Sequence, residues 1–297
     1  MRLVLVHGIN QQGKDPKALK QEWLGYLCKR LGKPDGFAEI EVVMPYYGDV
    51  LKDYSDRAGG NAISQGPDGT PDLDEAQFLA AALLETAAAA GIGAAAIATE
   101  QRAMAREDGA INEQSLVMSR RFNAIVRVLE RVSPMHGSWV MRILKQAYAY
   151  ARKTKVADAV DKIVQPAFAP GPMVVVAHSL GTVVSFKLLR AMAAKGGRID
   201  VPLFVTVGSP LSLMAIQAAL GPAFARPEGV KCWINALDPD DFITLGKPLD
   251  DTTFGMGTEV INFVDVENYR EDAHSIGGYL DDKRVAEAIA KACGIAV

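Results

Sequence analysis

A serine follows a run of apolar residues in the stretch MVVVAHSLGT, residues 173–182. Ser179 has Ala177 two residues before it and Gly181 two residues after it, so the segment matches the G-x-S-x-G nucleophile elbow with alanine for the first glycine. The elbow is a sharp turn from a strand into a helix, and large side chains at these two positions would collide with it. The pattern therefore predicts a nucleophilic Ser179. The alternative is a serine that only caps a helix.

A serine hydroxyl is a poor nucleophile unless a base accepts its proton, and the chain offers four histidines. His274 lies in EDAHSIGG, after the last predicted strand and before the last predicted helix, at the sheet edge where α/β proteins place their sites. His7 belongs to the first loop, His136 to a helical insertion, and His178 would point away across the serine turn. We expect His274 to be the base. The alternative is a surface histidine that caps a helix.

The base needs an acidic residue to orient its second nitrogen. The loop DPDDFIT, residues 238–244, follows a predicted strand and contains the candidates. Asp241 is the first choice because the two apolar residues after it would anchor the loop and hold the carboxylate inward. Asp238 is the alternative, although its place at the strand end also suits a turn with Pro239.

Acyl transfer also requires donors for the developing oxyanion. One should be the backbone N–H of Leu180, the residue after the nucleophile. The second should be that of Ile9, in the loop HGINQQG that follows the first predicted strand. Gly8 would let this backbone approach the serine, and Gly181 supports the same close packing.

Short apolar runs alternate with amphipathic segments in both halves of the chain. The predicted strands are residues 2–6, 39–44, 173–177, 203–207, 231–237 and 260–264. One predicted helix begins after Asp15, and three others span residues 180–194, 211–220 and 283–292. Continuously apolar strands that alternate with helices predict an α/β fold, with a mostly parallel sheet covered by helices on both faces.

Residues 47–165 interrupt this alternation and carry no strand signal. Apolar residues recur at helical spacing in residues 116–132 and 138–164, which predicts a large helical cap inserted into a single domain of residues 1–297. The alanine-rich stretch 79–98 is about as long as a membrane span. Its alanines, Glu85 and two glycines favour a packed helix or helical hairpin over a lid surface on lipid, and both over a span.

Composition argues against nucleic-acid-binding, disulfide-rich and metal-binding proteins. The net charge of −3 gives no basic footprint for nucleic acid. Three scattered cysteines indicate neither a disulfide framework nor, with the histidines, a metal site, so we expect no metal and no cofactor. The N-terminus passes directly into the first predicted strand without a signal peptide, and we expect a cytoplasmic protein.

Together, these motifs make the chain resemble the α/β-hydrolase family. The resemblance rests on VLVHG, AHSLG, VGSPL, NALDPDDFIT and DAHSIGGYL, and it covers residues 1–46 and 172–297. Ser179, Asp241 and His274 occur in the order that this family uses. Its lipases and esterases carry a similar D-P-x-x-D-x-[IV] loop, which favours Asp241 over Asp238.

The resemblance implies hydrolysis of a carboxylic ester or related acyl bond through an acyl-enzyme. A small-molecule ester or a lipid-like substrate is expected, with the cap shaping the acyl pocket as a lid. A peptidase or amidase, a membrane-facing phospholipase and an inactive binding scaffold are the alternatives. Contact with a membrane surface is compatible with the sequence but is not predicted, and the oligomeric state stays open.

Overall fold

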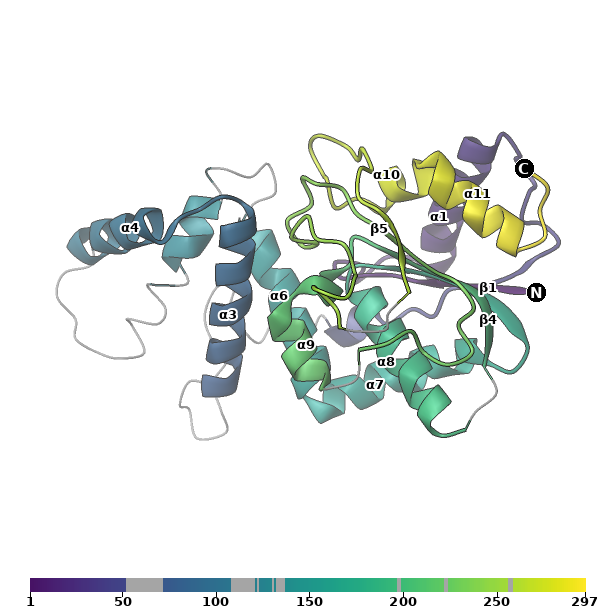
Figure 1. Cartoon of the computed structure of the whole chain (residues 1–297), viewed down its shortest axis with the longest axis horizontal. Coiled ribbons are helices and arrows are strands. Elements are labelled where there is room, and N and C mark those ends of the chain that lie inside the picture. The colour runs from purple at the N-terminus through teal and green to yellow at the C-terminus, as the bar shows by residue number, and fades with distance from the viewer. Residues whose placement is uncertain are drawn as a thin grey trace.

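One parallel sheet forms the centre of the molecule (Figure 1). A computed structural model provides the structure and describes residues 1–51, 72–107, 121, 123–129, 131, 137–196, 199–221, 224–255 and 259–297. In these ranges the strands are β1 (Arg2–Val6), β2 (Glu41–Val43), β3 (Pro172–His178), β4 (Asp200–Val207), β5 (Trp233–Ala236) and β6 (Ile261–Phe263). They lie in the order β2-β1-β3-β4-β5-β6, and every neighbouring pair is parallel. The predicted α/β class is confirmed.

Helices cover both faces of this sheet. One layer consists of α1 (Pro16–Leu31), α10 (Ile276–Asp281) and α11 (Lys283–Ala292). On the other face α8 (Leu180–Ala194) contacts β1 and β3, and α6 (Gly137–Arg152), α7 (Thr154–Val164) and α9 (Met214–Leu220) pack around it. Successive residues of β1 show the division, because Leu3 and Leu5 belong to one buried cluster whereas Val4 and Val6 belong to the other. Burial on both faces explains why the strands are continuously apolar.

The first helix begins and ends at residues suited to those positions. The Asp15 carboxylate accepts hydrogen bonds from the backbone N–H groups of Lys17 and Ala18, and Pro16 occupies the first turn. Gly32 ends the helix with a left-handed φ of 64°. Helix α1 thereby runs back beside the sheet and leads into β2.

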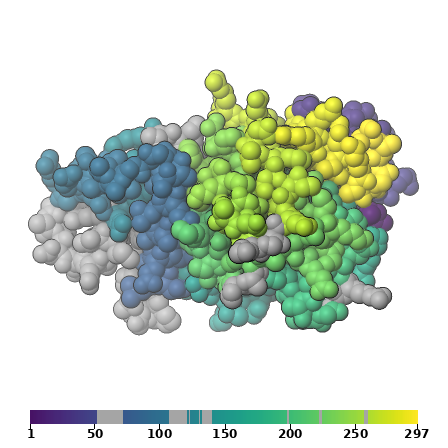
Figure 2. Space-filling model, viewed as in Figure 1, coloured from purple at the N-terminus to yellow at the C-terminus, as the bar shows by residue number. Residues whose placement is uncertain are grey.

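The described part of the insertion is helical. Helix α3 (Leu73–Ala89) and helix α4 (Ala94–Glu107) share the alanine-rich stretch and are joined by a short turn, and α4 extends away from α3 and from the sheet (Figures 1 and 2). No helix within the described ranges has both the length and the apolar character needed to cross a bilayer. The stretch predicted as helical over residues 138–164 is two helices, α6 and α7, separated at Lys153.

The two parts of the insertion differ in their contacts. Helix α6 packs against α3, α8 and α9, whereas α7 continues through a 3₁₀ turn at Gln165–Phe168 into β3. The Lys187 ammonium of α8 lies 2.9 Å from the Asp161 carboxylate of α7. Helix α7 is therefore part of the layer that covers the sheet, next to α8.

Candidate active site

Ser179 occupies a sharp turn between β3 and α8. Its backbone angles, φ 54° and ψ −127°, are rare for a residue with a side chain and cost about 1–3 kcal/mol. Hydrogen bonds stabilise the turn, since the Ser179 N–H donates to the Val207 carbonyl at 3.1 Å and the Thr182 N–H donates to the Ser179 carbonyl at 3.0 Å. The turn places the serine at the amino end of α8, where backbone N–H groups have no partner within the helix.

Glycines allow two backbone segments to approach this turn. A β-carbon on Gly181 would lie 2.3 Å from the Val6 carbonyl oxygen, so α8 could not pack against the end of β1 with any side chain there. A β-carbon on Gly8 would lie 2.6 Å from the Ser179 β-carbon. The first loop therefore runs directly over the serine, as Gly8 was expected to allow.

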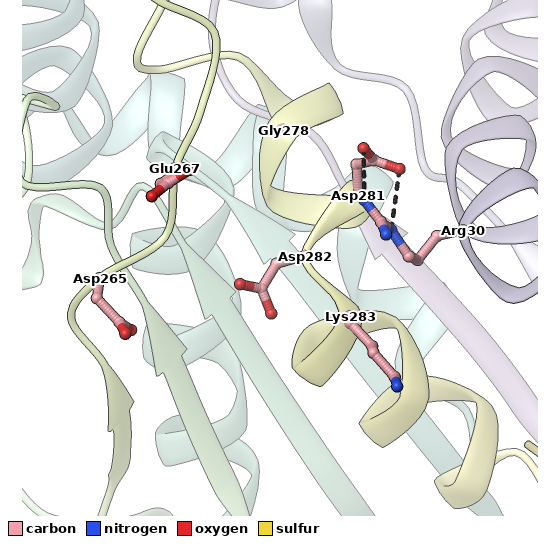
Figure 3. A pocket seen from close by; sticks show the side chains of 7 residues that line it. All are labelled: Arg30, Asp265, Glu267, Gly278, Asp281, Asp282 and Lys283. Carbon is pink, nitrogen blue, oxygen red and sulfur yellow. Dashed lines mark hydrogen bonds and ion pairs between the residues drawn. The ribbon is translucent and has the colours of Figure 1, made fainter.

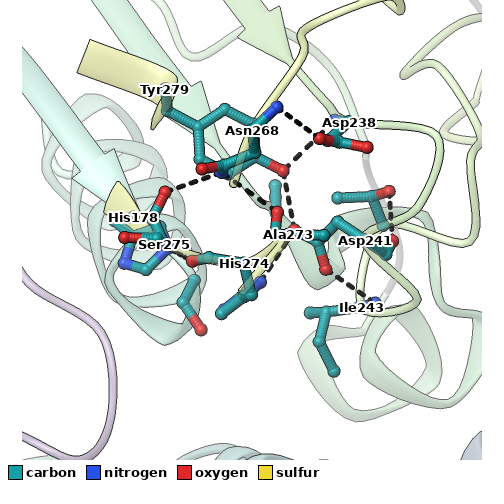
Figure 4. Close-up of polar contacts among 12 residues, drawn as sticks. His178, Asp238, Asp241, Ile243, Asn268, Ala273, His274, Ser275 and Tyr279 are labelled. Atoms are coloured by element: carbon teal, nitrogen blue, oxygen red, sulfur yellow. Dashed lines mark hydrogen bonds and ion pairs between the residues drawn. The ribbon is translucent and has the colours of Figure 1, made fainter. Parts of the chain in front are cut away.

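The predicted base and acid form a buried pair. His274 Nδ1 lies 2.7 Å from Asp241 Oδ2, and their side chains are 2% and 0% exposed (Figure 4). The other carboxylate oxygen of Asp241 accepts the Ile243 N–H at 3.0 Å. Because Nδ1 donates to the carboxylate, Nε2 of the neutral imidazole is left as the basic nitrogen.

Gly208, which follows β4, separates the serine turn from this pair. Ser179 bonds to Val207, the neighbour of Gly208. A β-carbon on Gly208 would lie 3.1 Å from Asp241 Oδ2 and 3.2 Å from His274 Cε1, the ring atom between the two nitrogens. The structure thus brings all three predicted triad residues to one edge of the sheet, at the ends of β3, β5 and β6.

Asp238 is adjacent to the pair but has other partners. Its carboxylate accepts the backbone N–H groups of Asp240 at 2.7 Å and Asn268 at 2.6 Å. Burial raises the pKa of its carboxyl group above the usual range. Asp238 therefore joins two loops, and the turn that the sequence allowed for it at Pro239 is present.

Hydrogen bonds to main-chain carbonyls hold the loop that carries His274. Three consecutive carbonyls accept hydrogen bonds from outside the loop backbone. The Asn268 amide donates to Ala273 at 3.0 Å and to Ser275 at 2.7 Å, and His178 Nε2 donates to the His274 carbonyl at 2.8 Å. These contacts hold the backbone of His274 in place and do not involve its imidazole ring.

The other two described histidines are buried and neutral. Burial lowers the pKa of His178 well below its usual range, and the nearby His274 lowers it further. Burial lowers the pKa of His7 to about 4. His7 Nε2 accepts the Tyr47 N–H at 3.2 Å and Nδ1 donates to the Gly8 carbonyl at 2.7 Å, so this ring holds the first loop in place. His136 lies outside the described residues.

The expected oxyanion donors belong to residues that adjoin the serine turn. Leu180 is the first residue of α8, and Ile9 follows the glycine that touches Ser179. Both residues are buried. The Gln11 amide donates to the Ile9 carbonyl at 2.9 Å and thereby fixes the peptide plane after Ile9.

The site is closed to solvent. Ser179 is 0% exposed, and its Oγ is buried without a hydrogen-bond partner among the described residues. A buried hydroxyl without a partner is costly and uncommon in folded proteins. This Oγ is therefore available to bond with a group that enters the site.

Another hollow lies beside α10 and α11 and has no triad residue in its lining (Figure 3). It measures about 280 Å³ and is lined by Arg30, Asp265, Glu267, Gly278, Asp281, Asp282 and Lys283. Its charges are largely satisfied by ion pairs with arginines. Across the described ranges, no cluster of three or more histidine, cysteine or acidic side chains is arranged to hold a metal ion.

Comparison with known proteins returns no relative. No protein-family model, curated protein or solved structure matches the chain. The geometry described above is accordingly the basis for any functional assignment.

Three residues of the site were not singled out from the sequence. Asn268 and Tyr279 bond to the acid and base loops, and His178 contacts the base although its ring was expected to point away. The only signal in the sequence was proximity, because Tyr279 lies five positions after His274 and His178 directly precedes Ser179.

Proposed function

We propose that the protein is a serine hydrolase that cleaves a carboxylic ester through a Ser179–His274–Asp241 triad. The main support for this proposal is the buried pair of His274 and Asp241, with Nδ1 2.7 Å from Oδ2. Next to this pair, Ser179 occupies a strained turn at the amino end of a helix. Strain at a single serine, an unbonded buried hydroxyl and a buried histidine–aspartate pair seldom coincide without a catalytic reason.

The arrangement of the sheet supports an α/β-hydrolase fold. The nucleophile follows β3, next to the centre of the parallel strand order. The acid follows β5 and the base follows β6, which reproduces the chain order serine, aspartate, histidine of that family. In this proposal the described insertion helices α3, α4 and α6 form the cap.

The reaction would proceed in two halves. His274 Nε2 takes the proton of Ser179 while Oγ attacks the ester carbonyl, and the backbone N–H groups of Ile9 and Leu180 stabilise the oxyanion. His274 then gives the proton to the leaving alkoxide, which departs as an alcohol. Water, deprotonated by His274, attacks the acyl-enzyme, and His274 returns the proton to Ser179 Oγ as the acid is released. Asp241 stays ionised throughout and stabilises the imidazolium.

The substrate class follows from the surroundings of the serine. Burial of Ser179 at the start of α8, a helix that contacts insertion helix α6, favours an apolar acyl group, such as a small ester or a lipid-like molecule. The substrate must displace or pass the residues that now cover the hydroxyl, so the cap is the proposed element of selectivity.

Intact mass after treatment with a fluorophosphonate tests the assignment. The probe reacts when serine oxygen attacks phosphorus and fluoride leaves, so it reports an activated hydroxyl directly. We expect one adduct on the wild type and none on Ser179→Ala or His274→Ala. Ser185→Ala is the matched control, because Ser185 is an equally buried serine of α8 that lies outside the triad, and it should label like the wild type.

An absence of labelling on folded wild-type protein would overturn the proposal in favour of a binding scaffold. Labelling that survives Ser179→Ala would place the nucleophile elsewhere. If the protein labels as expected, matched ester and amide substrates then distinguish an esterase from an amidase or peptidase, and phospholipid vesicles test the phospholipase alternative.

A further inference from the structure

The hydroxyl of Tyr279 lies between the two aspartates of the acid loop. Tyr279 belongs to α10, is fully buried, and follows the base loop by only a few residues. Its oxygen lies 2.7 Å from Asp241 Oδ2 and 3.2 Å from the Asp238 backbone nitrogen (Figure 4). The tyrosine therefore contacts the oxygen of Asp241 that also binds the His274 ring.

The direction of these hydrogen bonds is determined by their partners. The Asp238 N–H can only donate, so the Tyr279 oxygen accepts there. An ionised carboxylate can only accept, so the phenolic proton points to Asp241 Oδ2. Burial raises the pKa of Tyr279 well above its usual range, and the charge of Asp241 raises it further, so the hydroxyl keeps its proton throughout the range in which enzymes are assayed.

We propose that Tyr279 is a positioning residue of the triad, which holds Asp241 Oδ2 against His274 Nδ1 and limits how strongly that oxygen attracts the imidazolium. This inference rests on the proposed function. The two donors share one oxygen, and each withdraws negative charge that the other would otherwise receive. The tyrosine would thereby set the basicity of His274 as well as the orientation of the acid.

The charged and titratable groups around His274 come from several elements. Asp241 faces the ring from the loop after β5, and His178 faces it from the end of β3. Asp272, on the loop of His274 itself, is close enough for its charge to interact with the histidine. Asp238 is within electrostatic reach of Asp241. Tyr279, on α10, adds a side-chain hydroxyl that donates to the acid.

The test is the rate of fluorophosphonate labelling as a function of pH in the wild type and in Tyr279→Phe. Tyr150→Phe is the matched control, since Tyr150 is also fully buried and donates to a carboxylate at 2.7 Å, that of Asp161, in the opposite helical layer. Removing the Tyr279 hydroxyl leaves Asp241 more basic and the His274 imidazolium more stable. Because labelling requires neutral His274, the acid limb of the profile should move to higher pH by about one unit.

The plateau rate above this limb should also fall, by about tenfold, because the acid is less firmly held. Tyr150→Phe should retain the wild-type limb and plateau. Equal profiles for the two variants would overturn the role of Tyr279 but leave the proposed function intact, whereas a wild type that does not label would overturn the proposed function itself.

If Tyr279→Phe fails to fold, a variant that keeps the hydroxyl provides the test instead. Replacement of Tyr279 by 3-fluorotyrosine retains the phenol and makes it a stronger donor. The acid limb should then move to lower pH, opposite to the phenylalanine variant. An unchanged limb in this folded variant would contradict the proposal.

Discussion

The two aspartates of the acid loop differ in what they bind. Asp241 bonds to the ring of His274, whereas the Asp238 carboxylate is occupied by the backbone N–H groups of two loops. The sequence favoured Asp241 over Asp238, because the two apolar residues after Asp241 would hold its carboxylate inward. Side-chain contacts distinguish them, and these contacts lead to different expectations for the labelling rates of the two asparagine variants.

Asp241→Asn should lower the labelling rate of Ser179 by about 10³–10⁴-fold, since the amide has nearly the same shape but favours the wrong tautomer of His274. Asp238→Asn should act on stability rather than on labelling. An amide offers one acceptor where Asp238 uses two, so one partly buried N–H loses its partner and the free energy of unfolding falls by about 1 kcal/mol.

Labelling kinetics and urea denaturation on both variants make the comparison. We expect Asp238→Asn to label within about tenfold of the wild type at the plateau. A larger loss in Asp238→Asn than in Asp241→Asn would reassign the acid.

At the scale of single residues, the three residues of the proposed triad could be predicted from the sequence, but the residues around them could not. Ser179 and His274 could be predicted because a turn motif and a strand-end loop identify them locally. Tyr279 could not, because its role depends on α10 folding back so that its hydroxyl reaches a loop near residue 240, 41 positions away from Asp238. Hydrogen bonds of this span leave no periodic or compositional trace.

Helices and strands whose boundaries are determined by neighbouring residues in the sequence were predicted best. Strand β1 and helices α8 and α11 have the predicted bounds. Helix α10 was not predicted, since its sequence IGGYLD contains two glycines, which disfavour a helix. The fold uses them for contact, because a β-carbon on Gly278 would lie 1.9 Å from the Asn268 side-chain oxygen.

Helix α9 begins later than predicted, for a reason that lies far away in the chain. Residues Pro210–Ser212 form a 3₁₀ turn and Leu213 is extended, so the helix starts at Met214. Its first N–H groups, those of Met214 and Ala215, donate to the carboxylate of Glu85 on α3 at 2.9 and 3.2 Å. A cap supplied from 129 positions away cannot be read from the local sequence.

Glu85→Ala should therefore loosen the contact between α3 and α9. Two backbone donors lose their acceptor, which should cost about 1 kcal/mol of stability and accelerate hydrogen exchange at Met214 and Ala215. Glu85→Gln keeps one acceptor oxygen and serves as the matched variant with an intermediate effect. Hydrogen exchange measured by mass spectrometry checks this, and protection unchanged in Glu85→Ala would show that the carboxylate does not hold the helix.

For the whole molecule, the described insertion helices and the sheet share one buried apolar cluster. Val4 and Val175 of the sheet belong to the same cluster as Leu79 of α3 and Leu144 of α6. A cap with its own separate core could unfold alone, but a shared core couples the two parts. We therefore expect residues 1–297 to unfold as one unit, in line with the single domain predicted from the sequence.

Leu144→Ala tests this coupling. Leu144 is 0% exposed on α6, so its truncation should lower the free energy of unfolding by about 2–5 kcal/mol. Circular dichroism and the fluorescence of the buried tryptophans should still report a single, coincident transition. Leu73→Ala is the control, because Leu73 of α3 is 68% exposed and its loss should change stability by less than about 0.5 kcal/mol. Two separate transitions would show that the cap is independent.

The hydrogen bonds to the main-chain carbonyls of residues 273–275 affect how the kinetics of variants at position 274 can be interpreted. Because the side chains of Asn268 and His178 hold these carbonyls, we expect replacement of the His274 side chain to remove the imidazole and leave the peptide that carried it in place. Kinetic differences between variants at position 274 can then be attributed to proton transfer, with little contribution from loop rearrangement. The position is therefore suited to histidine analogues of graded ring acidity, with which the dependence of rate on basicity could be measured in a constant geometry.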